Sequence, residues 1–241
     1  MQALRSLRTR MIEALPPDRT VSDKPLQRAD VESLARQGTP CHLTACDLDE
    51  TDLSGLDLSG WVFERCSLKR AKLKGAKLER TQWLGCRAAF ADFMGADLTE
   101  SRFQSGDFNN ASLRRTTLVS ASFKGSKLTG VDFSEARALN AQFEEVLLIN
   151  AKLPSFGFRK TTLARIDFSQ ADLRKCDFRD SVFEDCNLRD TTLTGCRFEG
   201  ADLRGADLGG LRMVDAALFR GATISRQQAG QLLAELGLKV R

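Results

Sequence analysis

Residues 91–100 of this chain read ADFMGADLTE, which is two copies of one five-residue unit. In each copy, Ala and Asp precede a large apolar residue, Phe93 in the first and Leu98 in the second. Stepping by five in both directions keeps this large position in phase from Leu43 to Leu218, over 36 positions. Leu or Phe fills 32 of them, and the exceptions are Trp83, Ala88, Ala138 and Met213.

Chance does not explain this pattern. Leu and Phe make up 34 and 15 of the 241 residues, so random placement puts only about seven of them at these positions. The residue two places before the large one is mostly small, as at Cys46, Thr51, Cys66, Ala71, Ala76, Ala91, Ala96, Ala111, Ala171 and Ala201. Glycine often closes the unit, at Gly55, Gly60, Gly95, Gly125, Gly200 and Gly205.

A period of five matches neither the 3.6 of an α-helix nor the 2.0 of a flat strand. The chain must therefore turn a corner every five residues, and four corners close one coil of twenty residues. The small and the large residue then point inward, and the other three point outward. This predicts an all-β solenoid of about nine coils, roughly 43 Å long at a strand spacing of about 4.8 Å.

The pattern resembles the pentapeptide-repeat family, whose consensus is A(D/N)LXX, over residues 41–220. The resemblance implies a right-handed quadrilateral β-helix and a role in binding other proteins. Some members, the quinolone-resistance proteins, are dimers that mimic duplex DNA and bind type II topoisomerases such as gyrase. The resemblance therefore offers a topoisomerase as the most concrete partner.

Both ends of such a solenoid would expose its core, so helical caps are expected in residues 1–40 and 221–241. A second N-terminal helix is predicted from near Asp23 and Pro25 to Gly38. A C-terminal helix is predicted after the N-cap Ser225, ending at Gly237. The first N-terminal helix is expected from the apolar stripe Ala3, Leu4, Leu7, Met11, Ala14 and Leu15.

All seven cysteines occupy the small inward position, which predicts buried structural thiols. They are Cys41, Cys46, Cys66, Cys86, Cys176, Cys186 and Cys196. A redox or metal role is the alternative, but a straight row of thiols suits neither a disulfide nor tetrahedral zinc. The only histidine is His42.

The acidic residues before the large position recur because the repeat recurs, so they share one environment, whereas an acid and base pair needs two. The glycines lie at repeat corners and not in a phosphate-binding loop. We therefore expect a non-enzymatic protein with no cofactor, no metal and no small-molecule substrate.

Charge is balanced along the repeat, because residues 41–220 hold 26 basic and 26 acidic side chains. Acidic residues gather in 47–57 and basic residues in 64–87, which predicts either ion pairs between coils or a charge-segregated surface. A neutral rod weakens the DNA-mimic interpretation. Direct binding of nucleic acid is also disfavoured, since exposed aromatic residues are missing from the pattern.

Outward apolar residues gather in the middle coils at Val119, Leu139, Leu147 and Ile149. They are a candidate partner surface, although β-branched residues on a stacked wall also reflect strand propensity. Ala88 and Ala138 leave the large position underfilled, so Phe90 or Leu139 could instead turn inward there.

The C-terminal segment is a candidate homodimer interface, formed by Ala229, Leu232, Leu233, Leu236, Leu238 and Val240. It resembles the terminal helix and strand through which the quinolone-resistance proteins pair. The alternative is that the segment folds wholly onto the last coil and the chain stays monomeric.

Two functional interpretations remain. The first is a rigid module that binds a protein partner, and the second is a scaffold, effector, immunity-type or secretion-associated accessory whose N-terminal helices dock or target the rod. No run of 18 apolar residues and no conventional signal peptide is found, which favours a cytoplasmic protein without membrane contact. The arginine-bearing N-terminus is also compatible with a transit peptide or a non-classical secretion signal.

Overall fold

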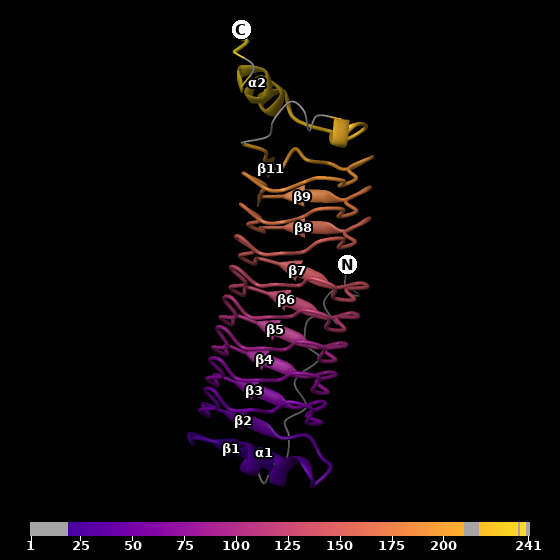
Figure 1. Cartoon of the computed structure of the whole chain (residues 1–241). Helices are drawn as coiled ribbons and strands as arrows, with labels where there is room; N and C mark the ends of the chain where they lie inside the picture. Colours follow the sequence, from indigo (N-terminus) through magenta and orange to yellow (C-terminus); the bar gives the residue numbers. More distant parts are fainter. Residues whose placement is uncertain (1–18, 210–216, 236, 240–241) are drawn as a thin grey trace, which may run out of the picture.

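The computed structural model describes residues 19–209, 217–235 and 237–239, and it shows a rod of stacked coils (Figure 1). Nine of the described strands form one parallel sheet along one wall of the rod, in chain order from β1 to β9. The strands are β1 Thr20–Ser22, β2 His42–Thr44, β3 Val62–Glu64, β4 Gln82–Leu84, β5 Arg102–Gln104, β6 Ser122–Lys124, β7 Gln142–Glu144, β8 Thr162–Ala164 and β9 Val182–Glu184.

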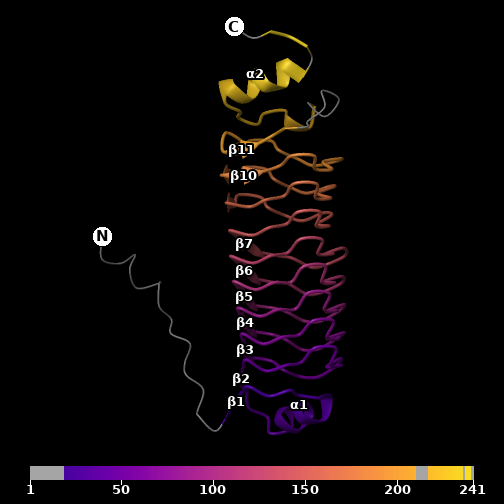
Figure 2. The same cartoon turned by 90° about the vertical axis from the view of Figure 1, so that its left-hand side faces the viewer.

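The other three walls of each coil are held by shorter parallel contacts. In the first full coil they start at Asp47, Asp52 and Asp57, and each of these residues bridges to the residue twenty places later. Two further short strands, β10 Cys186–Asn187 and β11 Ala206–Asp207, pair in the same register. Figure 2 shows the coils stacked from α1 at one end to α2 at the other. The predicted four-sided solenoid of about nine coils is confirmed.

The corners explain why glycine is frequent at the closing position of the five-residue unit. The closing residue has a positive φ, as at Gly60 (74°), Glu100 (59°) and Ser105 (55°). This left-handed conformation costs little for glycine and more for a residue with a Cβ. The same corner is nevertheless made by many non-glycine residues, so the stacking of the coils overrides the local preference.

An aromatic ladder fills the centre of the rod behind the nine-stranded sheet. The rings of Phe63, Trp83, Phe103, Phe123 and Phe143 stack in order, with centroids 4.2, 5.8, 4.5 and 5.0 Å apart. Phe103 and Phe123 are each 1% exposed and Phe143 is 5% exposed. The predicted burial of these three rings in one ladder is confirmed.

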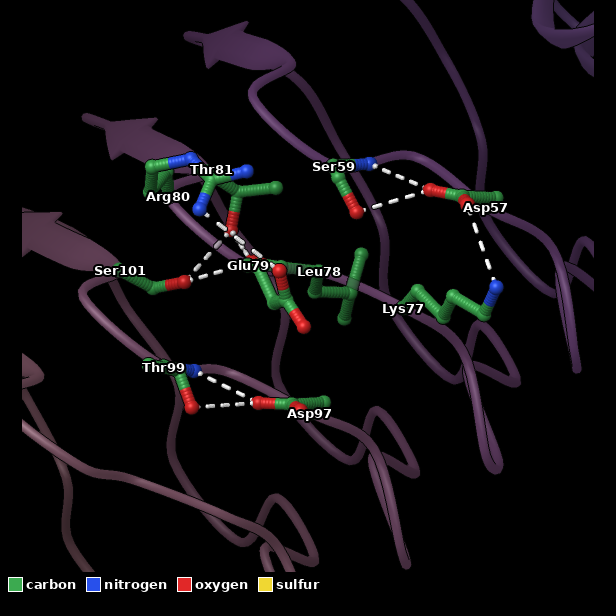
Figure 3. Close-up of polar contacts among 10 residues, drawn as sticks. All are labelled: Asp57, Ser59, Lys77, Leu78, Glu79, Arg80, Thr81, Asp97, Thr99 and Ser101. Carbon is green, nitrogen blue, oxygen red and sulfur yellow. Dashed lines mark hydrogen bonds and ion pairs between the residues drawn. The ribbon is translucent and has the colours of Figure 1, made fainter.

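Polar side chains in the repeat form hydrogen bonds with backbone N–H and C=O groups, as Figure 3 shows. Inside, Thr81 and Ser101 occupy the small position and both donate to the carbonyl of Leu78. Outside, the carboxylates of Asp57 and Asp97 accept the backbone N–H two residues later. Asp before the large residue is thus a turn former, which accounts for its recurrence without any catalytic role.

The N-terminal cap differs in detail from the prediction. The predicted second helix is present as α1, Arg28–Ala35, but it begins after the predicted start near Asp23 and Pro25 and ends before Gly38. Residues 20–22 instead form β1, and Leu26 N–H donates to Asp47 O at 2.8 Å. These backbone groups are used in the ladder and cannot enter a helix. The helix buries Val31 against the first coil. The stripe predicted at residues 3–15 lies outside the described residues.

The five-residue phase ends before Leu218. Asp202 bridges to Thr223 and the ring of Phe198 stacks on Phe219, so both contacts span 21 residues instead of twenty. Phe219, and not Leu218, therefore takes the core position that the phase assigns to the large residue. The predicted unbroken repeat is wrong at this end, where one extra residue shifts the last contacts by one place.

The C-terminal helix α2 is Arg226–Glu235, which confirms the predicted helix. Ser225 Oγ accepts the backbone N–H of Gln228, and the Gln228 side chain accepts the N–H of Ser225 in return. The buried Gln228 amide also donates to the carbonyls of Leu203 and Ala206 at 2.7 and 2.6 Å. The helix is thereby fixed onto the end of the described coils.

Candidate protein-interaction surfaces

The seven cysteines are all buried and free, as their inward position predicts. All seven donate to a backbone carbonyl 22 to 25 residues earlier in the chain, for example Cys86 Sγ to Phe63 O and Cys176 Sγ to Leu153 O, both at 3.1 Å. Burial raises the pKa of the Cys186 thiol above its ordinary value. Protonated, hydrogen-bonded thiols of this kind have a structural role and are poor nucleophiles.

Charged side chains on the surface pair along the axis of the rod. Six ion pairs join residues twenty apart on neighbouring coils: Glu50–Arg70, Asp57–Lys77, Arg115–Glu135, Lys124–Glu144, Asp132–Lys152 and Glu145–Arg165. Glu50 and Asp57 belong to the acidic first coil, and their partners belong to the basic second coil. Two of the five carboxylates in residues 47–57 are thus paired with basic side chains of the next coil, which offsets part of the acidic charge of the first coil.

The candidate partner surface is divided between two walls. Leu139 is 66% exposed at a corner beside the half-buried Val119, which lies one coil earlier. Leu147 and the half-buried Ile149 lie on another wall, and the wall that contains β7 separates them from Leu139 and Val119. Phe90 is also exposed, at 56%, so neither Phe90 nor Leu139 turns inward to fill the space beside Ala88 or Ala138.

Beside Leu139 the backbone ladder is interrupted. On the coils before and after it the pattern is regular, since Leu118 N–H donates to Arg137 O and Phe158 N–H donates to Asp177 O, both at 2.8 Å. Within the described residues, the equivalent bond from Ala138 to Gly157 is absent, and so is the bridge between Arg137 and Gly157. The pairing of β7 with β8 is likewise reduced to Glu144 and Ala164.

An exchange of side-chain sizes coincides with this interruption. Ala138 occupies a large position, whereas Phe156 occupies the small position stacked on Ala136. The Phe156 ring is 4% exposed and lies 5.6 Å from the ring of Phe133. A ring in a small position displaces the preceding coil, because the core is close-packed. Ala138 on that coil has no large side chain whose packing would oppose the displacement.

A ring in the small position is not sufficient to open the ladder. Trp61 also occupies a small position, yet Val62 N–H donates to Cys41 O of the preceding coil at 3.0 Å, the bond that corresponds to the missing one from Gly157 to Ala136. There the large position of the preceding coil holds Leu43, which is fully buried. Alanine in a large position is not sufficient either, since Ala88 N–H donates to Asp107 O at 2.7 Å, so the ladder opens where the two features coincide.

The result is a surface groove of about 820 Å³, which we call the seam groove. It is lined by Ser120, Ala136, Arg137, Ala138, Leu139, Asn140, Ala141, Gln142, Ser155, Phe156, Gly157, Arg159 and Thr161. This groove was not among the sites predicted from the sequence. The signal was present, because Phe156 stands in a small position and Gly157 follows it in an outward strand position where glycine weakens pairing.

The candidate dimer residues lie at the far end of the rod. Leu233 and Leu238 are 38% and 54% exposed, whereas Ala229 and Leu232 are half-buried and Leu232 packs against the core. Leu236 and Val240 lie outside the described residues. Helix α2 thus covers the last described coil with one face and leaves Leu233 exposed, and Leu238, just after the helix, is exposed as well.

In the part of the chain that the structure describes, no group of three or more His, Cys, Asp or Glu side chains is placed to hold a metal ion. No described helix is long and apolar enough to cross a membrane.

The stacked coils, the inward small and large residues and the corner geometry define a four-sided parallel β-solenoid. The family described as pentapeptide repeat region matches residues 38–113 and 139–213, and the chain belongs to this family. A comparison with curated protein sequences finds no match.

Solved structures with the same architecture include QnrB1, described as a plasmid-mediated fluoroquinolone resistance protein. It is 19% identical to this chain, with 91% of this chain and 100% of that chain covered and a TM-score of 0.53. HetL, a pentapeptide repeat protein of the cyanobacterium Nostoc sp. strain PCC 7120 involved in the regulation of heterocyst differentiation, is 22% identical. It covers 79% of this chain and 87% of its own length, with a TM-score of 0.37.

Proposed function

We propose that the protein is a non-enzymatic interaction module that presents its rigid surface to a protein partner. The observation that carries the proposal is Leu139, a large apolar side chain held 66% exposed at the edge of the seam groove. Exposed apolar groups beside a concave surface are typical of protein-binding sites. The buried thiols and the structural role of the repeated Asp residues leave little chemistry for an enzyme.

The proposal is tested by photo-crosslinking in cells that express the chain natively. A benzoylphenylalanine residue replaces Leu139 in one variant, Leu147 in a second and the exposed Glu199 in a control. A discrete crosslinked protein from position 139 or 147, and none from position 199, supports the proposal. The absence of a discrete product from both positions would reject it.

A narrower form of the proposal names the partner as a type II topoisomerase such as gyrase, with the rod acting as a mimic of duplex DNA in the cytoplasm. The fold shared with QnrB1 motivates this form, while the ion pairs between coils argue against a continuous acidic surface. A gyrase supercoiling assay, with and without a fluoroquinolone, tests it. Protection from the drug or inhibition of supercoiling would support the narrower form, and no effect of the protein would remove it while leaving the general proposal in place.

The candidate homodimer is also part of the proposal. Two copies that pair through Leu233 and Leu238 would cover the apolar side chains that one chain leaves exposed on α2 and just after it. A partner protein would then meet two rods joined end to end.

A further inference from the structure

We infer that the seam groove is a docking site for an extended peptide segment of a partner protein, one that carries a large apolar side chain next to a carboxylate. This inference rests on the proposed interaction role and makes it specific. It commits to one surface, the interrupted ladder between residues 135–142 and 154–162, and to one kind of ligand.

The backbone of the groove favours an extended segment. Within residues 19–209, the N–H groups of Glu135, Ala138 and Asn140 lack the backbone partners that the corresponding groups of other coils have. The equivalent groups one coil earlier, such as Leu118 and Ser120, donate at 2.8 and 2.9 Å. Peptide N–H groups left without a partner are matched by the carbonyls of an added strand. A globular surface without a free strand could not supply them in register.

The apolar lining favours one large side chain on that segment. Ala138 stands at a position that holds Leu or Phe in most units of the repeat, and it is only half-buried. Leu139 forms the rim of the groove, and the buried ring of Phe156 is part of its lining. A Leu or Phe side chain from the ligand would occupy the space that Ala138 leaves and would cover both neighbours.

The charge of the groove favours a carboxylate beside the apolar side chain. Arg137 and Arg159 are the charged residues of its described lining, so the groove has positive charge only. Arg159 forms an ion pair with Asp180, with Nε and Oδ2 3.5 Å apart. Arg137 is exposed, on the wall where the bridge to Gly157 is absent. Guanidinium groups bind carboxylates through paired hydrogen bonds. A basic or neutral segment would lose this contact.

The groove is bounded by intact structure. Phe133 N–H donates to Lys152 O at 2.8 Å on one side, and Glu144 pairs with Ala164 on the other. The corner between them keeps its usual geometry, because Asn140 has a φ of 56°. Binding would therefore not require the coils to reorganise, which lowers the free-energy cost of ordering the site.

The first experiment measures amide hydrogen exchange by NMR in the full-length chain. We expect the amides of Ala138 and Asn140 to exchange at least about a hundredfold faster than those of Leu118 and Ser120. Equal protection of all four would overturn the inference, because it would mean that the groove is already closed in the free protein. Closure by residues 1–18 of the same chain would give that result.

The second experiment selects seven-residue peptides displayed on phage with the full-length chain, with counter-selection on Gly157→Trp. A Cβ at Gly157 would meet no atom within 4 Å and its φ is not left-handed, so the indole should fill the groove without unfolding the coil. Arg197→Trp is the matched control, since Arg197 lies on the same wall two coils later. Both variants are checked for folding by circular dichroism.

We expect the selected peptides to carry an aliphatic or aromatic residue beside Asp or Glu, and to slow exchange at Ala138 and Asn140. Arg137→Glu should weaken binding of the best synthetic peptide by at least about tenfold, whereas Arg197→Glu should leave it unchanged. Failure to enrich any sequence, equal binding to Gly157→Trp, or a basic consensus would overturn the inference. A wild-type chain that is dimeric, with Gly157→Trp monomeric, would also overturn it, because the groove would then hold a second copy of this chain.

The inference and the proposed function can fail separately. Crosslinking from Leu147 together with a groove that binds no peptide would leave the interaction role standing and place the partner on the other wall. Peptide binding with no crosslinked partner in cells would show a competent groove in a protein whose cellular role lies elsewhere.

Discussion

The rings of Phe103 and Phe123 stack with their centroids 4.5 Å apart and their planes at 11°, although the residues are twenty apart in sequence. Phe123 also contacts Phe143 and Phe133. We expect Phe123→Ala to lower the free energy of unfolding by about 3 to 5 kcal/mol, because it leaves a cavity in the centre of the ladder. Urea titration measures this. The exposed control Gln104→Ala should change it by less than about 0.5 kcal/mol, and a loss below about 1 kcal/mol for Phe123→Ala would contradict the stacking.

The buried thiols give a second prediction. Ellman's reagent should react with few cysteines in the native protein and with all seven after denaturation, because each thiol lies inside a coil. The reaction is followed by absorbance before and after addition of guanidinium chloride. Full reaction in the native state, or zinc or a disulfide in the purified protein, would show that the cysteines have another role.

Stability should fall at alkaline pH. Burial raises the pKa of the Cys186 thiol in the folded chain, so the unfolded chain loses this proton first. The contribution of this thiol to the free energy of unfolding is therefore complete below the unfolded pKa of about 8.5, and it is lost as pH rises above that value. We expect the urea midpoint to decrease from pH 7.5 to pH 9.5, and to decrease less in Cys186→Ala. An equal decrease in both proteins would assign the effect to other groups.

The left-handed corners predict stabilising substitutions. Glu100 has a φ of 59° and Gly95 has a φ of 71°, one corner earlier, with no atom near a Cβ added to the glycine. Glu100→Gly should raise the free energy of unfolding by about 0.5 to 1 kcal/mol, and Gly95→Glu should lower it by a similar amount. Thermal and urea unfolding of the two variants check this pair. A change of the same sign in both would mean that side-chain contacts, and not φ, decide stability at the corners.

The proposed homodimer predicts a change of mass. Light scattering at tens of micromolar should give twice 26.7 kDa for the intact chain and 26.7 kDa for folded Leu233→Glu. The glutamate would place a charge in the apolar interface of both copies at once. Leu147→Glu is the control and should stay dimeric. An intact chain that is monomeric at this concentration would reject the interface.

The repeat predicted the fold because packing alone selects the residue at the large inward position of each five-residue unit, from Leu43 to Leu208. Each Leu or Phe must be buried every five residues, and only a four-sided coil does this. The ends were less predictable. Residues 20–22 carry no five-residue phase and form β1 by backbone pairing with β2. The shift that brings Phe219 onto Phe198 follows from one extra residue that the side-chain pattern does not reveal.

The seam groove shows why a site can escape analysis of a repeat. Ala138 appears in sequence only as one of four exceptions, and Phe156 appears as one more apolar residue. Their effect depends on the coil that each one stacks on, since Phe156 lies over Ala136 and Ala138 lies under Phe158. The interruption is therefore a property of a pair of coils, and a pattern read one unit at a time does not contain it.

The two helical caps also determine that the rod has a finite length. A coil ends in a row of backbone donors and acceptors that another coil could continue, from the same molecule or a different one. Helix α1 buries Val31 at one end, and the Gln228 amide of α2 binds the carbonyls of Leu203 and Ala206 at the other. Loss of either cap would expose these donors and acceptors as a template for axial growth, so the same two helices that complete the core also limit association of the rods end to end.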